Sequence, residues 1–275
     1  MNKKAAADET SDTPPARRDE YVNSFANGLK VIVVFGQERR PMTLSEVAER
    51  GGLTRATARR ILLTLQALGY VGQQERLFFL TAKVLELGYA YLSSQGIAEL
   101  ALPAMERLSA EIDESCSMSV LEGDDIVYVA RVPTRRVMTI SLGVGARLPA
   151  YATSMGRVLL GGLPDADLAA RLAGAERQKL TSFTLTEAAA LRTRIRADAR
   201  QGWSMVKQEL ELGLVSVAVP VAGRNGEVFA ALNVGTQYRS GVEGHLKEQV
   251  LPALKATAEA ISRALAQRMN AAAAR

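Results

Sequence analysis

Residues 53–71 read Leu-Thr-Arg-Ala-Thr-Ala-Arg-Arg-Ile-Leu-Leu-Thr-Leu-Gln-Ala-Leu-Gly-Tyr-Val, and this stretch decides the fold of the first third of the chain. Thr54 is a suitable N-cap, and Gly69 can end a helix because glycine adopts the left-handed conformation at low cost. Between them, apolar residues recur at the spacing of one helix face: Ala58, Ile61, Leu62, Leu65 and Leu68. The stretch therefore predicts a helix from Thr54 to about Leu68 with one buried face.

The segments on both sides of this helix predict a helix-turn-helix that carries a wing. A short helix over residues 44–50 precedes it and ends at Gly51-Gly52. Apolar residues at helical intervals from Val22 to Phe35 predict another helix further upstream. Downstream, residues 70–80 contain two short apolar strands around a polar turn. The order of these elements predicts a winged helix-turn-helix domain over residues 21–81.

The charge of this segment favours DNA as its partner. The chain has a formal net charge of +5, and the charged residues from Arg50 to Arg76 are all arginines except Glu75. A recognition helix presents its N-terminal residues to base edges in the major groove, where arginine can pair with guanine. The candidate DNA-binding residues are Ser45, Thr54, Arg55, Thr57, Arg59, Arg60 and, at the tip of the wing, Arg76.

Two alternatives remain for these basic residues. The arginines of the helix could simply face solvent, as in an ordinary exposed helix. The pair Arg39-Arg40 fits a solvated loop as well as a phosphate contact. The glycine turn, the N-cap and the wing favour the DNA interpretation for the helix.

Length and composition set the outer limits. A chain of 275 residues is comfortable for two domains. The single cysteine, Cys116, excludes an intramolecular disulfide and favours a reducing compartment. Residues 1–20 are polar and predict a disordered arm, without the apolar core of a signal peptide. With no apolar run long enough for a membrane span, we expect a cytoplasmic protein with no membrane partner.

The rest of the chain predicts a linker helix and an α+β domain. Residues 82–96 have a helical pattern suited to joining two domains, and the pattern changes from Ile97. An antiparallel sheet flanked by helices is predicted over 97–268, and the last residues, 269–275, read as a frayed tail. The expected strands are 116–121, 126–132, 137–142, 215–221 and 228–234, and the expected helices are 100–112, 154–160, 165–173, 187–201 and 242–268. Arg224-Asn225-Gly226 is a type I′ turn signal between the last two strands.

Several stretches of the chain share one resemblance to known proteins. They are Tyr21-Val-Asn-Ser-Phe-Ala26, Gly52-Leu-Thr-Arg-Ala-Thr-Ala-Arg-Arg60, residues 137–160 with Leu148-Pro-Ala-Tyr-Ala-Thr-Ser-Met-Gly-Arg157 within them, Gln208-Glu-Leu-Glu-Leu-Gly-Leu214, Ser216-Val-Ala-Val-Pro-Val221 and Ala230-Ala-Leu-Asn233. These stretches resemble the IclR family of bacterial transcriptional regulators, in particular the Pca/Pob-type branch that controls protocatechuate and 4-hydroxybenzoate catabolism. The resemblance spans nearly everything from residue 21 to residue 265. This sequence has Ala152 and Ser216 where some members of the family carry cysteine.

The resemblance implies a regulator that a small molecule controls. It implies a GAF-like effector domain, a homodimer or homotetramer on a palindromic operator, and RNA polymerase as a further partner. The effector implied is an acid of aromatic catabolism (protocatechuate, 4-hydroxybenzoate or β-ketoadipate), and many members are activators. A repressor that responds to another small carboxylate is the alternative, and no cofactor or metal is expected.

The effector site is predicted from loops and strands of the second domain. Free N–H groups at the start of the helix near 154 could bind a carboxylate, although Thr153 or Ser154 could equally be only the N-cap. Either Arg131 or Arg136 could pair with the acid. The resemblance adds Ser216 and Asn233, and suggests a structural or hydroxyl-binding role for Glu209 and Glu211. The candidate effector-binding residues are Arg131, Arg136, Tyr151, Thr153, Ser154, Met155, Gly156, Ser216 and Asn233; Tyr151 or Trp203 could also stack on an aromatic ring.

Two other classes of protein remain as alternatives. A hydrolase on the second domain is disfavoured because His245 is the only histidine, so no other residue can complete a Ser–His or Cys–His pair. Cys116 alternates with Met118 and Val120 as a core residue of a strand does. No catalytic residue is therefore proposed. An architectural DNA-binding protein would have no ligand, and its DNA affinity would not respond to acids.

Overall fold

The structure, a computed structural model, describes residues 21–38, 40–87, 97–134, 143–223 and 225–273. The chain divides into two units, Met1–Tyr91 and Leu92–Arg275, each with its own hydrophobic core. The predicted arm at 1–20, Arg39, Arg136, the predicted strand at 137–142 and residues 88–96 of the predicted linker helix lie outside the described residues.

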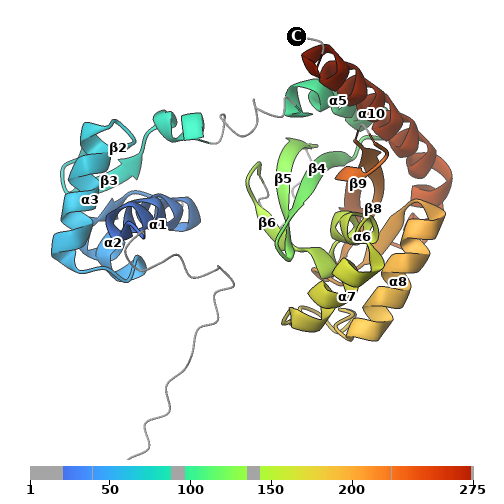
Figure 1. The fold of residues 1–275 in the computed structure, drawn as a ribbon, viewed down its shortest axis with the longest axis horizontal. Helices are drawn as coiled ribbons and strands as arrows, with labels where there is room; N and C mark the ends of the chain where they lie inside the picture. The colour runs from blue at the N-terminus through green and yellow to red at the C-terminus, as the bar shows by residue number, and fades with distance from the viewer. Residues whose placement is uncertain (1–20, 39, 88–96, 135–142, 224, 274–275) are drawn as a thin grey trace, which may run out of the picture. The chain divides into compact units, whose positions relative to one another are not determined.

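The first unit is a winged helix, as the sequence predicts (Figure 1). Its helices are α1 (Asn23–Glu38), α2 (Leu44–Arg50) and α3 (Arg55–Ala67), and its strands are β1 (Met42–Thr43), β2 (Val71–Gln74) and β3 (Leu77–Leu80). The strands pair antiparallel in the order β1-β3-β2. Buried residues of all three helices meet in one core that includes Val31, Phe35, Val47, Leu62 and Leu65.

Local hydrogen bonds explain why the helices begin where they do. Thr43 caps α2 in a capping box: its hydroxyl accepts from the Glu46 N–H at 3.3 Å, and its N–H donates to the Glu46 carboxylate at 2.8 Å. Thr54 caps α3 by accepting from the Thr57 N–H at 3.1 Å. Gly52 lies between the two helices with a φ of 59°, a conformation that favours glycine. As the sequence predicts, the glycines at 51–52 therefore follow the end of α2, and Thr54 caps the start of α3.

The start of the predicted linker is helical. A short 3₁₀ turn, η1 (Ala82–Val84), follows the wing, and helical backbone continues to Leu87. The linker helix as a whole remains a prediction, because its second half lies outside the described residues.

The second unit contains a six-stranded antiparallel sheet in the order β6-β5-β4-β9-β8-β7. The strands are β4 (Ser115–Glu122), β5 (Asp125–Val132), β6 (Arg147–Pro149), β7 (Ser204–Lys207), β8 (Leu214–Ala222) and β9 (Val228–Gln237). The sequence predicts four of them and misses β6 and β7, which are short. The expected α+β class is confirmed.

Helices cover both faces of this sheet (Figure 1). On one side lie α5 (Ile97–Ile112) and α10 (Leu251–Ala273), with α9 (Val242–His245) and a π-helical turn, η3 (Leu246–Val250), leading into α10. On the other lie a 3₁₀ turn, η2 (Ala150–Ala152), and the helices α6 (Ser154–Gly161), α7 (Asp165–Gly174) and α8 (Ala188–Gln201). Among the described residues, no helix has the length and apolar character needed to cross a membrane.

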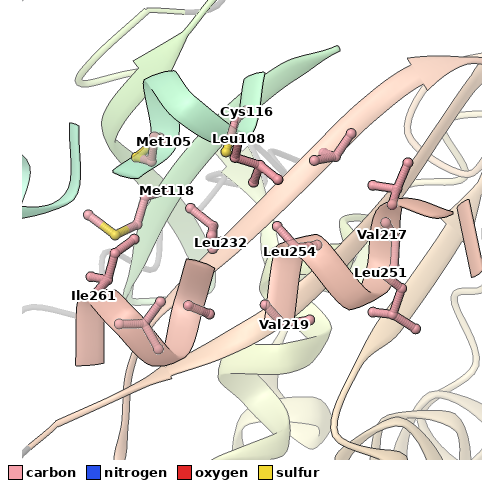
Figure 2. Packing of buried hydrophobic residues seen from close by; sticks show 14 of the residues in the cluster. Met105, Leu108, Cys116, Met118, Val217, Val219, Leu232, Leu251, Leu254 and Ile261 are labelled. Carbon is pink, nitrogen blue, oxygen red and sulfur yellow. The ribbon is translucent and has the colours of Figure 1, made fainter. Parts of the chain in front are cut away.

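Alternate strand residues pack under α5 and α10 (Figure 2). Cys116 and Met118 on β4 meet Met105 and Leu108 of α5 in this core. Burial raises the pKa of the Cys116 thiol to about 12, so this cysteine is a neutral packing residue. The opposite residues of the same strands face α6, where a second hydrophobic core that includes Ile126, Leu159 and Ala218 lies on the same face of the sheet as the candidate site.

One detail differs from the sequence prediction. The helix α10 continues to Ala273 instead of ending in a frayed tail after residue 268, because the final alanines have the highest helix propensity. The hairpin between β8 and β9 is present, and Gly226 in its turn has a φ of 80°. The type I′ assignment of this turn stays a prediction, because Arg224 lies outside the described residues.

Candidate functional site

The exposed face of α3 carries arginines whose charges are not neutralised within the described residues. Arg55, Arg59 and Arg60 are exposed and take part in no ion pair with any described residue. By contrast, Arg40 lies 2.9 Å from Glu46, and Arg50 lies 3.3 Å from Glu38. The loop residue Arg40 is therefore paired with carboxylates, whereas the arginines of α3 remain available for contacts with phosphates or bases.

The three helix arginines do not share one direction. Arg55 and Arg59 are four residues apart and lie on the same flank of α3, next to the buried Ala58 and Leu62. Arg60 follows Arg59 by one residue, about 100° around the helix, and lines a groove next to α1. Arg59 and Arg60 therefore point in different directions from the helix axis.

The other predicted DNA residues fall into two groups. The hydroxyl oxygens of Thr54 and Thr57 lie 2.9 Å apart, and Thr54 is the N-cap of α3, so both hydroxyl groups already have a partner within the helix start. Ser45 is exposed in the first turn of α2, and Arg76 is exposed in the two-residue turn of the wing. Glu75 in that turn has a φ of 54°, which makes the wing tip tight. All of these residues belong to the first unit.

An apolar groove lies between α1 and α3. Its volume is about 580 Å³, and its lining includes Phe25, Leu29, Ile61, Leu68 and Leu87. Phe25 is 67 % exposed, and Val33 on the same helix is 55 % exposed. Exposed apolar side chains in such a row are typical of an interaction surface.

The second unit contains a small cavity with polar and apolar lining residues between the sheet and the start of α6. It is lined by Ser115, Ser117, Tyr128, Arg131, Ala152, Thr153, Met155, Val206, Gln208, Glu209, Leu210, Leu214, Ser216, Asn233 and Gly235. Five of the nine predicted effector residues are among them: Arg131, Thr153, Met155, Ser216 and Asn233. The sheet register explains the grouping, because Ser117 pairs with both Arg131 on β5 and Asn233 on β9.

The start of α6 is capped from within. The Gly156 N–H donates to the Thr153 hydroxyl at 3.1 Å, so Thr153 is the N-cap. A side chain on Gly156 would overlap the backbone of Ala150, so this glycine permits the close approach of η2 and not of a ligand. The Ser154 hydroxyl is 2.8 Å from that of Ser216. Ser154 and Gly156 therefore position the cavity wall, while Thr153 and Met155 line the cavity.

Two predicted ring-stacking residues face other surroundings. The Tyr151 hydroxyl donates to the Gln178 carbonyl at 2.7 Å, and Tyr151 does not line the cavity. Trp203 packs against the core under α5 and α10. Tyr128, which is not among the residues predicted from the sequence, lines the cavity instead. Burial raises the pKa of its hydroxyl to about 12, so it is a neutral hydrogen-bonding group.

A buried ion pair lies next to the cavity, and its basic member, Arg157, is not among the residues predicted from the sequence. Arg157 is 2 % exposed and lies 2.6 Å from the Glu209 carboxylate. Its Nε donates to the Tyr151 carbonyl at 3.2 Å. The same carboxylate oxygen accepts from the Leu185 N–H at 3.0 Å. Glu209, which also lines the cavity, therefore connects the loop between β7 and β8 to α6 and to the segment before α8.

No signal in the sequence distinguishes Arg157 from an exposed helix arginine. It follows Gly156 within an amphipathic helix, and its partner lies 52 residues later in the chain. In the structure α6 is buried on all sides from Ser154 to Leu160, and only this burial shows that Arg157 lies inside the domain.

Comparisons with known proteins agree with this architecture. The IclR helix-turn-helix domain matches residues 24–75, and the C-terminal domain of the bacterial transcriptional regulator IclR matches residues 89–263. The chain is similar to the Pca regulon regulatory protein of Pseudomonas putida, with 43 % identity over 86 % of this chain and 82 % of that protein.

Two further relatives match over most of their length. The p-hydroxybenzoate hydroxylase transcriptional activator of Acinetobacter baylyi is 36 % identical over 88 % of this chain and 91 % of that protein. The crystal structure of a transcriptional regulator from Rhodococcus sp. RHA1 is 48 % identical, with a TM-score of 0.81 over 90 % of this chain and 99 % of that chain. With both of its domains matched, the chain belongs to the IclR family of bacterial transcriptional regulators.

Proposed function

We propose that this regulator controls an aromatic-catabolism operon in response to a small acid bound in the cavity of its second unit. The observation that carries the proposal is the cavity itself, where Arg131 can pair with a carboxylate and several hydroxyl and amide groups surround it. The name of the Acinetobacter baylyi relative supports 4-hydroxybenzoate as the first acid to test. The resemblance to the Pca/Pob-type branch adds protocatechuate and β-ketoadipate. As an IclR-family protein it is a regulator and not an enzyme.

We propose further that it is an activator that works as a homodimer or homotetramer in the cytoplasm, with RNA polymerase as a partner. The relative from Acinetobacter baylyi is named an activator, which supports that direction of control. The apolar groove of the first unit supports self-association, because a second copy would cover the exposed Phe25 and Leu29. A repressor that responds to another small carboxylate is the second candidate.

The direct test is whether DNA and acid affect each other's binding. A duplex selected from a random pool by the full-length protein is titrated with and without each acid, in a calorimeter at fixed salt. We expect one acid to change the DNA affinity by about 5- to 150-fold, and the DNA to change the affinity for that acid by the same factor. If none of the three acids binds, the effector proposal is wrong.

The DNA proposal predicts different results for two neighbouring arginines. Arg59 lies on the same flank of α3 as Arg55, whereas Arg60 lines the groove next to α1. We therefore expect Arg59→Ala to weaken binding to the selected duplex by about 5- to 150-fold. Its binding to unrelated DNA should fall much less. For Arg60→Ala we expect a similar, modest loss on both duplexes and a salt slope smaller by about one.

Filter binding at several salt concentrations measures both effects. An equal loss on both duplexes for Arg59→Ala would show that this residue contacts phosphate and does not read a base.

A further inference from the structure

One polar atom in the cavity lacks the partner that its burial demands. Asn233 is 8 % exposed, and its side-chain oxygen, Oδ1, has no hydrogen-bond partner among the described residues. A buried acceptor without a donor is unfavourable, and most such groups in proteins are paired. Asn233 lines the cavity, so a bound molecule can supply the donor.

The neighbouring hydroxyl groups do not fill this role. The Ser216 hydroxyl is bonded to that of Ser154 at 2.8 Å, and the Ser115 hydroxyl lies 3.2 Å from that of Thr134. On β8, the residue opposite Asn233 is Ala218, which has no donor in its side chain. The acceptor is therefore left for a group that enters the cavity.

The sheet register places this acceptor at a defined distance from the cation of the cavity. Arg131, Ser117 and Asn233 form one row across three adjacent strands, since Ser117 pairs with Arg131 on one side and with Asn233 on the other. Neighbouring strands are about 4.8 Å apart, so Arg131 and Asn233 are about 10 Å apart at the backbone. A ring with an acid group at one end and a donor at the other suits such a row.

We propose that Asn233 Oδ1 accepts a hydrogen bond from a hydroxyl group on the effector ring, opposite the carboxylate that Arg131 binds. This inference rests on the proposed function and narrows it to hydroxylated aromatic acids. Asn233 then determines specificity, because an acid without a donor at that end leaves the acceptor buried and unpaired. A dicarboxylate is disfavoured for the same reason, since its second ionised carboxylate has only acceptors to offer to Oδ1.

Matched acids test the inference on the full-length protein. The probes are 4-hydroxybenzoate, benzoate and 4-methoxybenzoate, which present a donor, no polar group and an acceptor at the same ring position, together with adipate as a stable dicarboxylate. We expect calorimetry to give at least about tenfold tighter binding of 4-hydroxybenzoate than of each other acid. The comparison needs no variant, so it does not depend on how a substitution folds.

The substitution Asn233→Leu removes the acceptor with little change in size. We expect it to abolish the preference for 4-hydroxybenzoate over benzoate and to leave thermal stability unchanged or higher, since the unpaired atom is gone. The control is Asn225→Leu, the same chemical change at an exposed turn, which should keep the preference.

The outcomes separate this inference from the proposed function. Equal binding of the matched acids, tighter binding of adipate, or a preference that survives in Asn233→Leu overturns the hydroxyl readout alone. Failure of every acid, including protocatechuate and β-ketoadipate, to bind overturns both.

Discussion

Replacing Glu209 by alanine is expected to lower the free energy of unfolding of the second unit by about 3–5 kcal/mol. The substitution leaves the Arg157 guanidinium, 2 % exposed, without the carboxylate that lies 2.6 Å from it. It also removes the acceptor for the Leu185 N–H. Urea unfolding followed by the fluorescence of Trp203 reports on this unit, because Trp203 is the only tryptophan in the chain.

Two variants show whether the buried charge is the cause. Glu211→Ala, two residues away at a partly exposed position, should change the stability by no more than about 0.5 kcal/mol. The double change Arg157→Met with Glu209→Leu should recover most of the loss, since apolar residues of similar volume replace buried ion pairs well. A loss below about 1 kcal/mol in Glu209→Ala would mean that water reaches Arg157, against its burial here.

The winged helix could be predicted because its signals are local. The cap at Thr54, the glycines at 51–52 and the apolar stripe of α3 all lie within a few turns of one another. Each signal acts through contacts close in sequence, so a pattern read along the chain captures it. The strand β1 was not predicted, because two residues are too few to show the alternation of a strand.

The second unit could be predicted only in outline. The long strands β4, β5, β8 and β9 have clear alternation or apolar runs, whereas β6 and β7 are defined by pairing with β5 and β8. Such strands take their structure from partners and not from their own residues.

The site depended still more on tertiary structure. Arg131, Ser216 and Asn233 are brought together by sheet register, which the sequence suggests but does not determine. Gly156 is among the residues predicted to bind the effector, but its actual neighbour is the backbone of Ala150. That neighbour lies only six residues upstream, yet the conformation of η2 decides which way the glycine faces. The unpaired oxygen of Asn233 had no counterpart in the sequence pattern at all.

The substitution Gly156→Ala is expected to destabilise the second unit by about 3 kcal/mol or more. The added methyl group would overlap the carbonyl oxygen and Cα of Ala150, which are backbone atoms in a buried turn and cannot rotate away. Alanine is otherwise favoured over glycine inside a helix by about 1 kcal/mol, so a net loss isolates the clash. Since Ala152, Thr153 and Met155 line the cavity, moving α6 away from η2 should also weaken acid binding.

Thermal unfolding followed by Trp203, together with calorimetry of 4-hydroxybenzoate, measures both consequences. The matched control is Gly174→Ala at the end of α7, where an added methyl group would meet no atom within 4 Å apart from its chain neighbours and the backbone of its own helix, and the backbone is not left-handed. We expect this control to leave stability and acid binding unchanged. An unaltered unfolding midpoint in Gly156→Ala would mean that η2 and α6 can separate without cost. The Thr153 cap would then be sufficient to hold the cavity wall, and the close packing of the two elements would have no role in it.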